Sequence, residues 1–131
     1  MVADDPRSER TELPVLRDYE DLTGTDGRPL AEQLVEVYTA NTRTTVAELA
    51  ARVAGATGAD PAAARVAHRL KGAAEAVGAR FTADACERLE QDLVAGRLDE
   101  ARRDMAALVD DLPHAFDRLN HALATLAAAR G

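Results

Sequence analysis

The chain has 131 residues and a mass of 13.9 kDa, which corresponds to a single domain. Its apolar content of 47% excludes wholesale disorder, and the scarcity of strand formers (3% aromatic residues, no Trp) excludes an all-β fold. The net charge of −7 argues against a nucleic-acid binder and against a protein that binds anionic membrane surfaces.

The N-terminal residues 1–12 are charged and contain Pro6, so we expect a loose solvated arm that includes Glu12. One domain is expected over residues 13–128. Residues 13–22 can form a short helix, which the Gly-containing segment 23–27 would end. A second helix is predicted from about Pro29 to residue 55, with one buried face made of Leu30, Leu34, Val37, Thr45, Leu49 and Val53.

The sequence marks the ends of the next two helices more clearly than those of the first two. Asp60 can cap a third helix that starts at Pro61, runs to about Val77 and is terminated by Gly78. A fourth helix is predicted over residues 82–95, with apolar residues four apart at Phe81, Ala85, Leu89 and Leu93.

Asp99 can cap a fifth helix, in which Pro113 predicts a kink or a break. Its apolar stripe alternates steps of three and four through Leu98, Ala101, Met105, Leu108, Leu112, Ala115, Leu119, Ala122 and Leu126. The fold class is therefore all-α. We expect an antiparallel up-down four-helix bundle with a short additional N-terminal helix.

The third helix carries the residues that indicate a chemical function. Helical spacing places an apolar set on one face, which we expect in the core: Ala64, Ala67, Leu70, Ala74 and Val77. His68, Lys71, Gly72 and Glu75 share a different face, toward solvent. Neutral imidazole is a nucleophile that can form a phosphoramidate, and a cation one turn away can attract the phosphoryl group.

Two further observations support a phosphate site at this face. Gly72 in mid-helix costs about 1 kcal/mol of helix stability relative to Ala, so its presence in an Ala-rich helix needs a reason. We expect the missing side chain to leave a dent in the helix surface that lets a partner approach the ring. Between Asp60 and Arg80 the sequence has four cations (Arg65, Arg69, Lys71 and Arg80) and two anions. This local excess of positive charge predicts a small basic surface around His68.

The segment from His68 to Ala79 has the pattern His-x-x-Lys-Gly, then a small pair, then Gly-Ala. It resembles the signature of histidine-containing phosphotransfer (HPt) domains, and the resemblance extends from about Leu30 to Leu123. That family is an up-down four-helix bundle whose exposed His carries a phosphoryl group between receiver-domain aspartates. The resemblance implies that His68 accepts the phosphoryl group, that Lys71 helps to hold it and that Gly72 admits the receiver.

The same resemblance places Glu90 near the imidazole, where family members often have Gln or Glu. It also implies partners: response-regulator receiver domains or a hybrid sensor histidine kinase, with Mg²⁺ held by the receiver and no cofactor in this chain. The sequence departs from the family at Ala73 and Ala74, where Ser is often found. It departs again at Arg69, which follows the His where a small polar residue is common.

The remaining reactive residues have simpler interpretations. His114 and His121 lie seven apart, whereas metal-binding pairs on a helix prefer four, so no metal site is expected. The single Cys86 is expected to pack as a small apolar residue. We expect a cytoplasmic monomer without autokinase activity, and the 15 Arg against one Lys suggest a GC-rich bacterial genome.

Three alternatives stay open. One is the dimerising phospho-acceptor domain of a sensor kinase, but His68 is followed by Arg rather than an acid, and no Gly-rich nucleotide-binding segment is present. Another is a purely structural helical adaptor, which leaves Lys71 and Gly72 unexplained. The third is a degenerate HPt-like bundle that binds partners without being phosphorylated.

Overall fold

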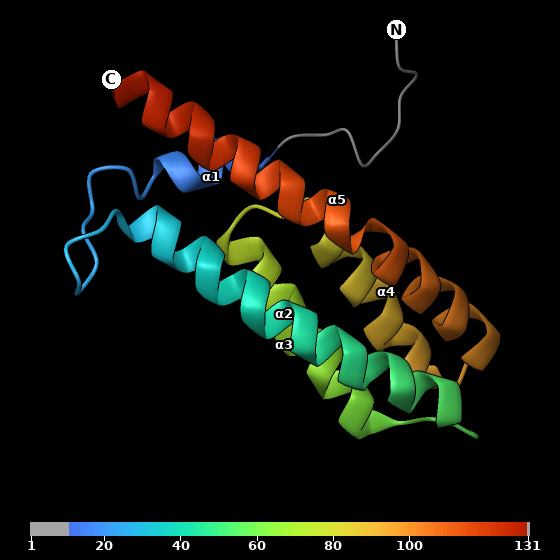
Figure 1. The fold of residues 1–131 in the computed structure, drawn as a ribbon. Helices are drawn as coiled ribbons and strands as arrows, with labels where there is room; N and C mark the ends of the chain where they lie inside the picture. Colours follow the sequence, from blue (N-terminus) through green and yellow to red (C-terminus); the bar gives the residue numbers. More distant parts are fainter. Residues whose placement is uncertain (1–10, 131) are drawn as a thin grey trace, which may run out of the picture.

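The chain folds into helices joined by short connections. The computed structural model describes residues 11–130, with α1 (Glu12–Arg17), α2 (Leu30–Gly55), α3 (Pro61–Ala76), α4 (Arg80–Ala95) and α5 (Leu98–Arg130). The two neighbours of α3 are α2 and α4, and α5 closes the bundle by packing against α4 and α2 (Figure 1). The all-α prediction of an antiparallel four-helix bundle with a short additional N-terminal helix is confirmed.

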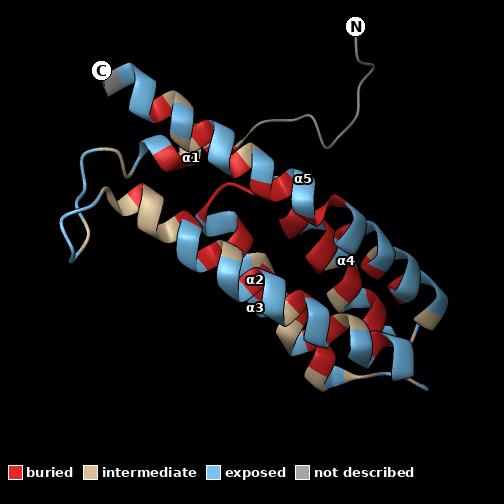
Figure 2. Cartoon of the chain, in the orientation of Figure 1, coloured by how far each residue is buried: buried red, intermediate tan, exposed pale blue. Residues whose placement is uncertain are grey.

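Small residues bring α3 and α4 close together. The buried face of α3 consists mainly of alanines, namely Ala63, Ala64, Ala67 and Ala74, together with Leu70. On α4 the buried residues include Ala83, Ala85 and Cys86, as the prediction for Cys86 required (Figure 2). Because few large side chains separate these helices, residues on their outer edges can reach each other, and this arrangement forms the site described below.

The buried face of α2 differs from the predicted one. Leu49 and Val53 are buried as expected, but the remaining core positions are Ala31, Val35, Tyr38, Thr42 and Val46. Val37 is 60% exposed, and Leu30, Leu34 and Thr45 are only partly buried. The prediction followed the large aliphatic residues, whereas the continuous stripe in steps of three and four includes an alanine, a tyrosine and a threonine. Leu34 and Val37, which were predicted to face the core, lie beside α3.

The last helix follows its predicted stripe closely. Every predicted apolar position from Ala101 to Leu126 is buried, and Leu98 is partly buried. The helix starts at Leu98, so Asp99 lies in its first turn rather than at the cap. Of the kink or break predicted at Pro113, the break does not occur, because α5 continues through this residue. Pro113 and Val109, whose carbonyl loses its hydrogen-bond donor, are both exposed, so water can satisfy that carbonyl.

Two parts of the N-terminal prediction are also wrong. The first helix ends at Arg17, not at residue 22, because Asp18, Glu20 and Asp21 place negative charge at the end of a helix, where the macrodipole is already negative. Glu12 does not belong to a solvated arm. It begins α1, is 3% exposed and accepts a 3.3 Å hydrogen bond from Nε of Arg118 on α5. Residues 1–10 lie outside the described part of the chain.

Two predicted helix boundaries are confirmed, and both depend on polar or glycine residues. Asp60 caps α3 by accepting a 3.1 Å hydrogen bond from the backbone N–H of Ala63. Gly78 ends the turn after α3 with a φ of +76°. A Cβ there would also lie 2.6 Å from the carbonyl oxygen of Thr11, so this glycine allows the start of α1 to pack against the end of α3.

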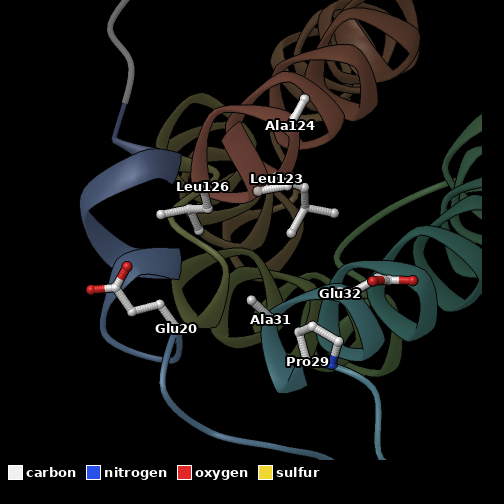
Figure 3. A pocket seen from close by; sticks show the side chains of 8 residues that line it. Glu20, Pro29, Ala31, Glu32, Leu123, Ala124 and Leu126 are labelled. Carbon is white, nitrogen blue, oxygen red and sulfur yellow. The ribbon is translucent and has the colours of Figure 1, made fainter. Parts of the chain in front are cut away.

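An apolar groove lies at one end of the bundle, between the start of α2 and the C-terminal part of α5, and Glu20, which follows the end of α1, also lines it. It has a volume of about 280 Å³, and Figure 3 shows the side chains that line it, including Pro29 and Ala31 near the start of α2 and Leu123 and Leu126 of α5. No residue of the α3 motif contributes to it. Within residues 11–130, every helix is too short or too polar to cross a lipid bilayer.

Candidate functional site

The predicted nucleophile His68 lies in the middle of α3 and faces solvent. Its side chain is 66% exposed, while Ala67 and Leu70 on the opposite side of the helix are buried. Asp60 and Pro61 fix the start of the helix, so the register that separates these two faces is determined locally. The prediction that Ala64, Ala67, Leu70, Ala74 and Val77 face the core is confirmed.

One nitrogen of the His68 ring is held by a neighbouring helix. Nδ1 lies 3.2 Å from Oε1 of Glu90 on α4, 22 residues further along the chain. A carboxylate can only accept a hydrogen bond, so this contact assigns the proton of the neutral ring to Nδ1. Nε2 is then the unprotonated nitrogen, which carries the lone pair of a nucleophile. The structure thus brings Glu90 to the position that the family resemblance implied.

Lys71 lies one turn further along α3 and is engaged by carboxylates. Its Nζ is 3.3 Å from Oε1 of Glu87 and 4.0 Å from Oε1 of Glu75. The hydrogen bond with Glu87 is the main reason why the pKa of the Lys71 ammonium is raised above its ordinary value. Lys71 is therefore a protonated cation beside His68, and its charge is already shared with α4.

Gly72 leaves the helix surface open next to the histidine. A Cβ built at this position would meet no atom within 4 Å outside its own helix. The glycine is therefore not required by packing, which is consistent with its interpretation as a place of close approach for a partner. Ala73 is exposed and Ala74 is completely buried, so of this pair only Ala74 needs a small side chain for packing in the core.

The predicted basic surface around His68 is wrong in part. Arg65 and Arg69 are exposed on α3, as the sequence indicated. However, α4 contributes the carboxylates of Glu87 and Glu90, and Glu75 of α3 adds a third. The sequence count covered one helix and missed the helix packed against it. The signal that could have identified Glu87 is its spacing of three from Glu90, which places both on one face of α4.

A second apolar groove begins beside the site. It lies between α2 and α3, has a volume of about 370 Å³ and is lined on α3 by Arg69, Ala73 and Ala76. On α2 it is lined by Leu34 and the exposed Val37, the residues that the core prediction had assigned to the interior. An exposed apolar patch of this kind can mark a docking site for another protein.

Other reactive residues lie away from this surface. Cys86 is buried, and burial raises the pKa of its thiol to about 12, so the thiol is not a nucleophile. His114 and His121 are exposed on α5. Among residues 11–130, no group of three or more His, Cys, Asp or Glu side chains is arranged to hold a metal ion.

A family model described as "Hpt domain" matches residues 33–129, which include α3, α4 and nearly all of α2 and α5. No curated protein and no solved structure gives a significant match to the chain.

Proposed function

The chain belongs to the Hpt domain family, whose members are phosphocarriers in two-component signalling, and we propose that His68 is its phospho-acceptor. The observation that carries the proposal is the state of the imidazole. Nδ1 is bound to Glu90, the side chain is 66% exposed, and Nε2 is therefore left as the nucleophilic nitrogen. The donor is a receiver-domain aspartyl phosphate or a hybrid kinase, and a second receiver takes the group onward.

The transfer step follows from this geometry. The Nε2 lone pair attacks the phosphorus atom, an Nε2–P bond forms, and the O–P bond of the acyl phosphate breaks to release the aspartate of the receiver. The ring becomes positively charged and keeps its Nδ1 proton, which the Glu90 carboxylate stabilises. Mg²⁺ held by the receiver would supply charge stabilisation for the transferring phosphoryl group.

The neighbouring residues have supporting roles in this proposal. Lys71 balances the negative charge of the phosphoryl group, and Gly72 allows the receiver's reacting aspartate to come close to the ring. Arg65 and Arg69 add positive charge on the solvent face of α3. The receiver docks on the groove between α2 and α3, because its apolar lining ends at Arg69, next to His68.

The test is phosphoryl transfer from a phosphorylated receiver with Mg²⁺, comparing wild type with His68→Gln. We expect acid-labile, base-stable label on wild type only. We also expect a monomer by size exclusion and no label from ATP alone, in contrast to a kinase dimerisation domain. If folded wild type takes no label from several receivers and a small-molecule phosphodonor, the protein is a degenerate adaptor.

A further inference from the structure

The cation next to the phospho-acceptor is already paired before any phosphate arrives. Lys71 Nζ lies 3.3 Å from Glu87 and 4.0 Å from Glu75, and its side chain is only 29% exposed. Glu87 belongs to α4 and is itself 47% exposed, so the pair crosses the same helix–helix edge as the contact between His68 and Glu90. A phosphoryl group on Nε2 must therefore compete with Glu87 for this ammonium.

The charges of the site make that competition significant. With a neutral imidazole, the set formed by His68, Lys71, Glu75, Glu87 and Glu90 has three carboxylates and one ammonium. A phosphoryl group adds a charge of about −1.5 to −2. The negative charge of Glu90 is compensated when the His68 ring becomes cationic, but the negative charge of Glu87 gains no new cationic partner. It either loses Lys71 to the phosphate or retains Lys71 and repels the phosphate.

We propose that Glu87 sets the phosphotransfer equilibrium: its carboxylate raises the free energy of the phosphohistidine, so the protein passes phosphoryl groups on instead of storing them. This inference rests on the proposed function of His68. The bonds made and broken are those of the transfer step, an Nε2–P bond in exchange for an aspartyl O–P bond, and only their relative stability changes. Glu75 has a weaker effect because its distance to Lys71 is longer and its side chain is 58% exposed.

The experiment measures how label divides at equilibrium between this protein and one receiver in the presence of Mg²⁺. Glu87→Gln should shift the equilibrium constant about 3-fold toward phosphohistidine, which is the size expected for an exposed charge pair. The shift should shrink at about 1 M salt because the charges are then screened. Glu100→Gln is the matched control, since it removes the same charge from α5, where Glu100 is paired with Arg103.

A double-mutant cycle assigns the effect to Lys71. If Glu87 acts through this cation, Lys71→Gln should move the equilibrium more in the Glu87→Gln background than in wild type, because Lys71 is then no longer shared with Glu87. An equilibrium constant that is the same for wild type, Glu87→Gln and Glu100→Gln, with His68 labelled in all three, would overturn the inference and leave the phosphocarrier function intact. Absence of label on wild-type His68 would instead overturn the phosphocarrier function.

Discussion

Nδ1 of His68 and Oε1 of Glu90 lie 3.2 Å apart and connect the middle of α3 to α4. This contact determines which ring nitrogen is free to react. Glu90→Ala should therefore reduce the transfer rate about 10-fold, because the ring is no longer held in one tautomer and one orientation. Glu90→Gln retains an amide oxygen that can accept from Nδ1–H, and we expect most of the rate to remain.

Nitrogen NMR of the His68 ring gives an independent readout for this pair of variants. In wild type and Glu90→Gln the spectrum should show the Nδ1–H tautomer, and in Glu90→Ala it should show a mixture. If Glu90→Ala transfers at the wild-type rate with the same tautomer, the contact between His68 and Glu90 has no part in the mechanism.

Lys71 is predicted to act on the charge of the phosphoryl group and not on the nucleophile. Lys71→Ala should slow transfer about 10-fold, the loss expected for one charge-assisted interaction, while His68 can still be labelled at long times. Lys71→Arg should recover part of the rate, because it restores the charge with a different shape. Single-turnover transfer measures both variants, and an unchanged rate in Lys71→Ala would remove this residue from the mechanism.

Substitutions of Gly72 should have opposite effects on the stability of the helix and on the rate of phosphoryl transfer. Gly72→Ala is expected to raise the free energy of unfolding by about 0.5–1 kcal/mol, because the site is open and Ala is the better helix former. Gly72→Gln should leave the helix folded but slow transfer, since its side chain occupies the approach to His68. Gly55→Gln, at the end of α2 with equally open surroundings, is the matched control. A full transfer rate for Gly72→Gln would contradict the assigned role.

The sequence predicted those parts of the site that lie on a single helix. His68, Lys71 and Gly72 share a face because of their spacing, and Asp60 and Gly78 mark the ends of that helix. The position of Glu90 followed from the family resemblance and not from spacing. The pairing of Lys71 with Glu87 was not predicted, because it depends on how α3 and α4 pack across a distance of 16 residues in the sequence.

Long-range ion pairs were not predicted from the sequence for the same reason. Glu12 and Arg118 are separated by 106 residues, and nothing in the local pattern around either one indicates a buried pair. The α2 stripe was misplaced for a different reason. Tyr38 and Thr42 fill core positions that a search for aliphatic residues passes over, while Val37 faces the groove beside α3.

Arg118 holds two buried carboxylates and should be important for stability. Its guanidinium donates to Asp111 at 2.8 Å and to Glu12 at 3.3 Å, and these acids are 1% and 3% exposed. Arg118→Met should lower the free energy of unfolding by about 3–5 kcal/mol, because both carboxylates lose their partner without gaining water. Denaturant unfolding measures the change. Arg103→Met, at a side chain that is 75% exposed, should change stability by less than about 1 kcal/mol.

Asp104 is predicted to make stability depend on pH. Desolvation and a hydrogen bond with the nearby Asp92 raise the pKa of Asp104 to about 6, although Arg88 at 3.8 Å opposes the shift. The folded state therefore binds this proton more tightly than the unfolded state does, and the contribution of Asp104 to stability falls as pH rises from about 4 to 7.

Asp104→Asn should remove this dependence. The substitution keeps a hydrogen-bonding side chain without the charge, so it should stabilise the protein by about 1 kcal/mol at pH 7.5. Near pH 4 the difference should become small, because Asp104 is then protonated in the folded wild type. Denaturant unfolding at both pH values tests the prediction, with Asp117→Asn as the control for net charge at an exposed position of α5. An equal difference at the two pH values would show that Asp104 is ionised throughout, and that Arg88 compensates for the repulsion from Asp92.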